Sequence, residues 1–280
     1  MLKAIDQAME QMGSLNHTLP RVMQVANDIN SSAREMVRVI QMDPVLTARV
    51  LRVANSAYFA MHEPVTNLRR ATILMGLNTI RNLALATAVR NSFQIESGCD
   101  VTSEDFWRYT VGCAVLSDQL ARRAAVDRQT IEEAFVIGIL HPIGRALLIQ
   151  HFPAQYNQVI GLAKAENTST KPQELKVFQT DHQAIGLSMV ARWKLPHNLA
   201  DGISYCTRPT YSSLKGTHLL SIAMHHIKAN RIGFCGDWTP HPVPDEVYAH
   251  LRLTRKKVEL LIEDVLESEL AKAEDFIKGV

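Results

Sequence analysis

The stretch DPVLTARVLRVANSAYF, residues 43–59, predicts an α-helix with a well-defined beginning. Asp43 is a favoured helix N-cap, and Pro44 has the fixed φ that suits the first helical position. Leu46 and Val50 lie four residues apart and therefore share one face of this helix, which we expect to be buried.

The residues on either side of this helix carry similar signals. Asn55 and Ser56 close it, and we interpret them as a structural cap and turn. Upstream, Ser32 and Glu35 have the spacing of a capping box, in which each side chain satisfies a backbone N–H at the start of a helix. Further upstream, Pro20 suits a first-turn position. These signals predict a series of short helices joined by tight turns.

Helical signals continue along the chain, and no alternating strand pattern occurs. Asn67 can cap LRRATILM, we expect Gly76 to end that helix in a left-handed conformation, and Asn78 is predicted to open the next helix. The fold class is therefore predicted to be all-α, with no significant β-sheet. Further helices are expected around residues 103–125, 130–140, 143–150, 153–166, 171–179, 181–193 and 196–206.

Two looser segments divide the chain. Residues Glu96–Thr102 are the best candidate for a boundary between two lobes. Residues 230–247 are rich in Gly and Pro and predict a long surface connection. The remainder, 248–280, predicts a last amphipathic helix capped by Thr254. We expect its apolar stripe to pack on the same chain, with a homodimer contact as the alternative.

Composition excludes several classes of protein. The chain has 280 residues, 46% of them hydrophobic, and a net charge of +2, which favours neither a nucleic-acid binder nor a polybasic membrane protein. Its four cysteines form no C-x-x-C pair, so a zinc finger is not expected. The sequence shows neither a secretion signal nor an apolar run of the roughly 20 residues that span a bilayer, so we expect a cytoplasmic protein.

Five blocks, in order, resemble the HDOD family, the HD-related output domains of bacterial regulatory proteins. DPVLTARVLRVANSAYF (43–59) and NLRRATILMGLNTIRNLALATAV (67–89) resemble its first half. FW (106–107), AFVIGILHPIG (134–144) and DHQAIGLSMVARWKLP (181–196) resemble its second half. The positions that carry the family signature are Asp43, Pro44, Asn55, Ser56, Gly76, Trp107, Gly144, Trp193 and Pro196.

The resemblance implies an HDOD domain over residues 13–210, built as a multi-helix HD-like bundle. A helical N-terminal lobe would cover about residues 1–98, and an HD-like lobe about 99–229. The family is similar to HD metal-dependent phosphohydrolases, in which helices project histidines and aspartates around one or two metal ions. Imidazole and carboxylate groups suit that role because they bind divalent metals and leave a position for an activated water.

The metal-ligand pattern of those hydrolases is incomplete in this chain. Two histidines are retained, and the remaining positions hold neither histidine nor aspartate. In chain order, the vestigial positions are Tyr109, His141, Pro142, His182, Tyr205, Cys206 and Met224.

Pro142 stands where the HD pattern has its aspartate. Proline has no side-chain ligand and no backbone N–H, and it biases His141 away from the α region. We expect the helix that carries His141 to end there and Pro142 to start the next one. His141 and His182 are then expected to be hydrogen-bonded core residues, because two neutral imidazoles without a carboxylate rarely hold a catalytic dication.

These expectations favour a non-catalytic signal-transduction module, without metal or cofactor, that binds a protein partner or a small signalling ligand. One alternative is a divergent phosphohydrolase in which His225 or Asp181 replaces a lost ligand. A weaker alternative is nucleic-acid binding through arginines of the 67–90 helical hairpin, although its second helix offers few polar side chains to contact bases. The arginines of that hairpin are Arg69, Arg70, Arg81 and Arg90.

Overall fold

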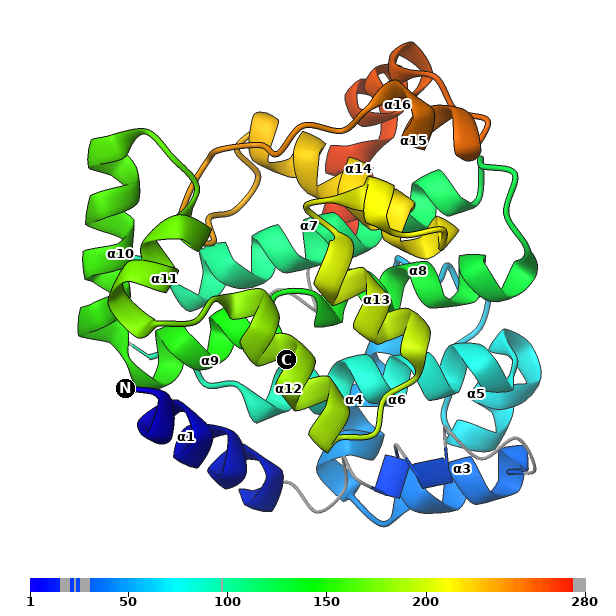
Figure 1. Ribbon diagram of the computed structural model, residues 1–280. Coiled ribbons are helices and arrows are strands. Elements are labelled where there is room, and N and C mark those ends of the chain that lie inside the picture. Colours follow the sequence, from blue (N-terminus) through cyan, green and yellow to red (C-terminus); the bar gives the residue numbers. More distant parts are fainter. Residues whose placement is uncertain (16–20, 23, 26–30, 97, 274–280) are drawn as a thin grey trace.

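The described part of the chain is helical, as predicted, and contains no β-strand. The computed structural model describes residues 1–15, 21–22, 24–25, 31–96 and 98–273. The predicted helix start at Pro20 lies outside these residues. Figure 1 shows the N-terminal helices on one side of the molecule and the C-terminal helices on the opposite side, with α7 between them.

The N-terminal helices begin at the capping residues that the sequence predicts. Ser32 and Glu35 form the capping box. Asp43 Oδ1 accepts the Leu46 N–H at 2.9 Å, and Asn67 caps its helix in the same way. The bounds are α1 (Leu2–Leu15), α3 (Ala33–Gln41), α4 (Pro44–Ala54), α5 (Leu68–Met75) and α6 (Leu77–Ser92).

Two details of this region differ from the prediction. The helix α6 begins at Leu77, so Gly76 rather than Asn78 directly precedes it. Gly76 has a φ of +86°, as expected for a glycine that ends a helix, but its ψ of 156° lies outside the left-handed helical region. This extended geometry turns the chain from α5 straight into α6.

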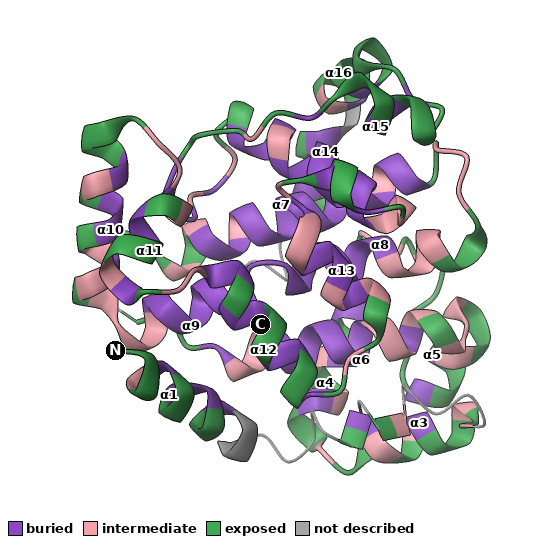
Figure 2. Cartoon of the chain, in the orientation of Figure 1, coloured by how far each residue is buried: buried purple, intermediate pink, exposed green. Residues whose placement is uncertain are grey.

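The second half of the molecule is organised around α7, which packs against α8 and α14. Figure 2 shows that α7 is buried along most of its length. Each predicted helix is present in this half, with ends that differ by a few residues. The bounds are α7 (Ser103–Ala121), α8 (Arg128–Leu140), α9 (Ile143–His151), α10 (Pro153–Glu166), α11 (Thr170–Phe178), α12 (His182–Arg192), α13 (His197–Tyr205) and α14 (Lys215–Ala229).

The stretch Arg128–His151 is long and apolar enough to cross a membrane by length and composition, which the sequence analysis did not anticipate. Of its most apolar window, 83% is buried inside the protein. The stretch comprises α8 and α9, which His141 and Pro142 separate. Such burial is typical of the core helices of a globular protein.

The predicted connection over residues 230–247 is only partly a surface loop. Cys235 and Asp237 are buried, so this segment contributes to the interior. It also ends earlier than predicted, because the short helix α15 (Asp245–His250) begins directly after Pro244.

The predicted last helix is present and runs without a gap from Arg255 to Lys272, although its middle is π-helical. Thr254 caps α16 (Arg255–Leu261), as predicted, and a π-helical turn (Ile262–Leu266) leads into α17 (Glu267–Lys272). The apolar side chain of Leu270 is buried, and α17 packs against α7. The described part of the apolar stripe therefore packs on its own chain, as predicted.

Candidate functional site

His141 lies at the junction between α8 and α9. The helix α8 ends at Leu140, as predicted from Pro142, but His141 itself stays in the right-handed α region (φ −56°, ψ −35°). The expected bias away from this region is therefore wrong here. The His141 N–H donates to Ile137 O at 3.0 Å, and the imidazole is bonded to Gly138 O, so local hydrogen bonds outweigh the steric preference of a residue before proline.

Both ring nitrogens of His141 have partners within the protein. Nδ1 lies 2.6 Å from Gly138 O and must be the donor, because a carbonyl can only accept. Nε2 then accepts from the hydroxyl of Tyr109 at 3.3 Å. Burial, the largest cause, lowers the pKa of His141 to about 3, so the ring is neutral. The lone pair that could bind a metal is thus taken by the tyrosine.

His182 is bonded in a comparable way by two residues that the sequence analysis did not select. Its Nδ1 lies 2.6 Å from Oε2 of the fully buried Glu174. Its Nε2 faces Nη2 of Arg145 at 3.1 Å. Burial and then the charge of Arg145 lower the pKa of His182, which keeps the ring neutral. Nδ1 therefore donates to the carboxylate, and the Nε2 lone pair accepts from the guanidinium.

Glu174 and Arg145 form a buried ion pair beside this histidine. Nε of Arg145 lies 3.7 Å from Oε1 of Glu174. Burial would raise the pKa of Glu174, but the contacts with His182 and the charge of Arg145 outweigh it and lower that pKa to about 2. Burial would likewise lower the pKa of Arg145, yet its neighbours, including Tyr156, Cys235 and Glu174, raise it. Both groups are consequently charged at neutral pH.

A second buried ion pair, between Asp237 and Lys228, is connected to the first through hydrogen bonds. Arg145 also donates to Thr170 Oγ1 at 3.0 Å and to Cys235 Sγ at 2.8 Å. Thr170 in turn donates to Asp237, whose carboxylate pairs with the buried Lys228. Buried charges that are paired and hydrogen-bonded in this way avoid much of the penalty of desolvation.

This arrangement does not fit a catalytic metal ion. In metal sites of this kind, a carboxylate orients a histidine through one ring nitrogen while the other nitrogen binds the metal. Glu174 and His182 have that relation, but the cation at Nε2 is the guanidinium of Arg145. The described residues contain no group of three or more His, Cys, Asp or Glu side chains able to hold a metal. The neighbouring position, Pro142, offers no ligand atom in its side chain.

The remaining vestigial positions, and the residues considered as substitute ligands, have other contacts. Cys206 is buried and accepts from Gln183 at 3.3 Å, and Met224 is buried in the core. Asp181 caps α12 by accepting the N–H groups of Gln183 and Ala184, and His225 Nδ1 faces His241 O. Tyr205 is partly exposed at the end of α13.

Comparison with known proteins agrees with the all-helical fold. The family model of the HDOD domain matches residues 12–209. This chain belongs to the HDOD family.

Solved structures show how widely this HDOD fold is shared. An HDOD domain protein of unknown function from Geobacter sulfurreducens has a TM-score of 0.77 at 20% identity, with 98% of each chain covered. A protein from Shewanella amazonensis SB2B, whose name proposes phosphohydrolase activity, has a TM-score of 0.70 at 28% identity, with 99% of this chain and 96% of that chain covered.

An uncharacterized protein of Treponema pallidum (strain Nichols) is 22% identical over 171 residues, which are 61% of this chain. The chain spans about a third of the length of that curated relative.

Several positions of the HDOD signature have a structural role. A Cβ on Gly144 would lie 2.0 Å from His182 O, so the glycine lets α9 and α12 approach closely. This approach brings Arg145 next to His182. Pro196 precedes α13, and Trp193 is the C-cap of α12.

The Asn55–Ser56 pair ties the end of α4 to the following loop. The Asn55 amide donates to Leu51 O and Val65 O, both at 2.8 Å, and its oxygen accepts the Val65 N–H. The Ser56 hydroxyl donates to Val53 O at 2.7 Å. These contacts agree with the predicted cap and turn.

Arg145 and Glu174 are the functional-site residues that sequence reasoning missed. Arg145 is the only charged residue in the run ILHPIGRALLIQ, and a lone charge in an apolar helix is a signal that it has a buried partner. Glu174 gives no such signal, because Lys171 and Lys176 beside it suggest an exposed helix.

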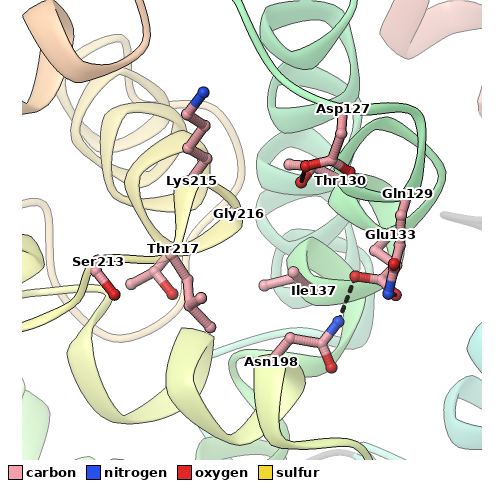
Figure 3. Close-up of a pocket in the computed structure, with 11 residues that line it drawn as sticks. Asp127, Gln129, Thr130, Glu133, Ile137, Asn198, Ser213, Lys215, Gly216 and Thr217 are labelled. Atoms are coloured by element: carbon pink, nitrogen blue, oxygen red, sulfur yellow. Dashed lines mark hydrogen bonds between the residues drawn. The ribbon is translucent and has the colours of Figure 1, made fainter.

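A separate hollow of about 360 Å³ lies between α8, α13 and the start of α14. Figure 3 shows Lys215 on one side of it and Asp127 and Glu133 on the other. These groups already have partners: Lys215 donates to Ala125 O, Asp127 caps α8, and Glu133 accepts from Asn198. The hollow is lined by neither His141 nor His182, so it is distinct from the HD-like site.

The neutral, buried state of His141 predicts that acid destabilises the HDOD domain. Its pKa is about 3 in the folded protein against 6.5 for a free histidine, so between these values the unfolded chain binds a proton that the folded chain does not. Stability is therefore fully present above about pH 6.5 and falls as pH decreases, by about 1.4 kcal/mol per pH unit for one such group.

Urea unfolding at several pH values between about 7.5 and 5 checks this. We expect His141→Asn to give a shallower dependence than the wild type, because asparagine can still donate to Gly138 O but does not titrate. His62→Asn is the control, because His62 lies in the loop before α5. An unchanged pH dependence in His141→Asn would show that the imidazole is not held neutral.

Proposed function

We propose that this HDOD protein is a non-catalytic regulatory module of bacterial signal transduction, acting in the cytoplasm by binding a protein partner or a small ligand. One observation carries this proposal. In both retained histidines, the Nε2 lone pair that could bind a metal accepts a hydrogen bond from the same chain. The donor is Tyr109 for His141 and Arg145 for His182.

The charge balance supports the same conclusion. A metal ion entering beside His182 would have to displace a guanidinium that is already paired with Glu174. It would also meet that positive charge at close range, because Nη2 lies 3.1 Å from Nε2. Repulsion between two cations in a buried site is strong, since little solvent screens it. The interior around His182 is therefore suited to stabilise the fold rather than to hold a metal ion.

A divergent phosphohydrolase is the second candidate, and it is favoured by the similarity to the Shewanella amazonensis protein. A metal-supplemented assay separates the two. The purified protein is incubated with Mn²⁺, Ni²⁺ or Fe²⁺, and hydrolysis of generic phosphomonoester and phosphodiester substrates is measured. We expect no turnover above that of the His182→Ala variant. Turnover that depends on metal and is lost on His141→Ala and His182→Ala would overturn the proposal.

A further inference from the structure

Two arginines of the N-terminal helices lie near each other, and the helices that carry them, α4 and α6, pack together. Arg90 comes from the last turn of α6, and its guanidinium carbon lies 4.2 Å from the ring centroid of Trp107 on α7. Arg49 of α4 donates to the side chain of Asn91, the residue after Arg90. Two helices thus bring two positive charges near each other, and one of these charges lies over the tryptophan of a third helix.

The charge of Arg90 has no counter-ion among the described residues. Burial and then the positive charge of Arg49 lower the pKa of Arg90 to about 10. Its Nε is buried and has no hydrogen-bond partner in the part of the chain that the structure describes. This differs from Arg145, whose charge is balanced by Glu174. Like charges held together without an acid are unfavourable unless an anion joins them.

The indole of Trp107 is the second independent observation. Its side chain is 1% exposed, and its Nε1 also has no hydrogen-bond partner among the described residues. A buried tryptophan N–H usually finds an acceptor. Because the guanidinium of Arg90 stacks on this ring, two unsatisfied donors lie next to each other. What the site lacks is an acceptor, and a negatively charged one.

We propose that Arg49, Arg90 and Nε1 of Trp107 bind a small oxyanion, a carboxylate or a phosphate group. Guanidinium groups bind such anions through two parallel N–H donors, and the indole N–H supplies a further hydrogen-bond donor. Arg49 and Arg90 are each partly exposed, so a ligand can reach them from solvent. This site names the class of small ligand that the proposed regulatory module would bind. Only the regulatory effect of binding rests on the proposed function.

Binding here would connect helices that are distant in sequence. Arg49 and Arg90 belong to the N-terminal helices, whereas Trp107 belongs to the central helix α7. An anion held by all three would strengthen the contact between them. A ligand that binds one arrangement of helices more tightly than another shifts the population toward it, which is how a regulatory module can respond to a small molecule.

Inorganic phosphate and malonate are the probes for the full-length protein. Isothermal titration calorimetry measures their binding at constant ionic strength, with chloride as the reference anion. We expect one equivalent of at least one probe to bind, and Arg90→Gln to weaken binding by about tenfold or more, because a hydrogen-bonded charge is lost. Trp107→Phe should weaken it less, since the ring remains and only the N–H is removed. Comparing the affinities for phosphate and malonate shows whether the site prefers a phosphate group or a carboxylate.

Matched controls separate binding from folding. Arg128→Gln removes an exposed arginine of α8 and should leave affinity unchanged. Arg90→Lys keeps the charge and should recover part of the affinity. Without added anion, Arg90→Gln should be at least as stable as the wild type, because it removes an uncompensated charge.

Two results would overturn the anion site. One is that neither probe binds more tightly than chloride, as expected if water alone satisfies these donors. The other is that Arg90→Gln binds as well as Arg128→Gln. Neither result depends on catalysis, so the site can fail while the proposed function stands. Metal-dependent turnover would refute the proposed function without affecting this test.

Discussion

Replacing Gly144 by alanine is expected to destabilise the protein by at least about 3 kcal/mol, because the added methyl group meets backbone rather than flexible side chains. A Cβ at this position would lie 2.0 Å from His182 O and 2.6 Å from Gly186 N. Neither atom can move without shifting α12. The helices α9 and α12 must therefore separate, which also moves Arg145 away from His182.

Urea unfolding followed by circular dichroism measures this loss, and Gly161→Ala is the matched control. Gly161 lies in α10, and a Cβ there would meet nothing within 4 Å. That variant should be stabilised by about 0.5–1 kcal/mol, because alanine favours the helix over glycine. If Gly144→Ala behaved like Gly161→Ala, the close approach of α9 and α12 would be wrong.

Glu174→Ala is the second large effect, with an expected loss of about 3–5 kcal/mol, the range for breaking a buried ion pair. The substitution leaves Arg145 charged and buried without its carboxylate, and it removes the acceptor of His182 Nδ1. Glu174→Gln should cost less, because the amide oxygen can still accept a hydrogen bond from one of them.

The control for this series is Glu63→Ala. Glu63 pairs with Arg70 on the surface, where an ion pair contributes less than about 1 kcal/mol. Chemical denaturation at neutral pH gives both values under the same conditions. A loss for Glu174→Ala as small as that for Glu63→Ala would mean that the buried network does not stabilise the fold.

The fold could be predicted well from sequence because its signals are local. A capping residue such as Ser32, Asp43 or Asn67 acts on the backbone two or three residues away, so the sequence alone indicates where a helix begins. The exceptions have physical reasons. The helix α15 follows a Gly- and Pro-rich segment whose composition suggested a loop, and it begins directly after Pro244, next to the first helical position that proline favours.

The site could be predicted only in part, because its contacts are between residues distant in the chain. The sequence shows that Pro142 cannot be a ligand and that Tyr109 is not a histidine. It does not show that Tyr109 donates to His141, or that Arg145 reaches Glu174 across α9 and α11. The guanidinium of Arg145 reaches His182 because α9 and α12 pack closely, and Gly144 allows this packing.

A crystal structure of the protein soaked with Mn²⁺, with an anomalous difference map, tests the central claim most directly. We predict no peak beside His182 and a guanidinium of Arg145 within hydrogen-bonding distance of its Nε2. A strong anomalous peak coordinated by His182 and Glu174, with Arg145 displaced, would contradict the account.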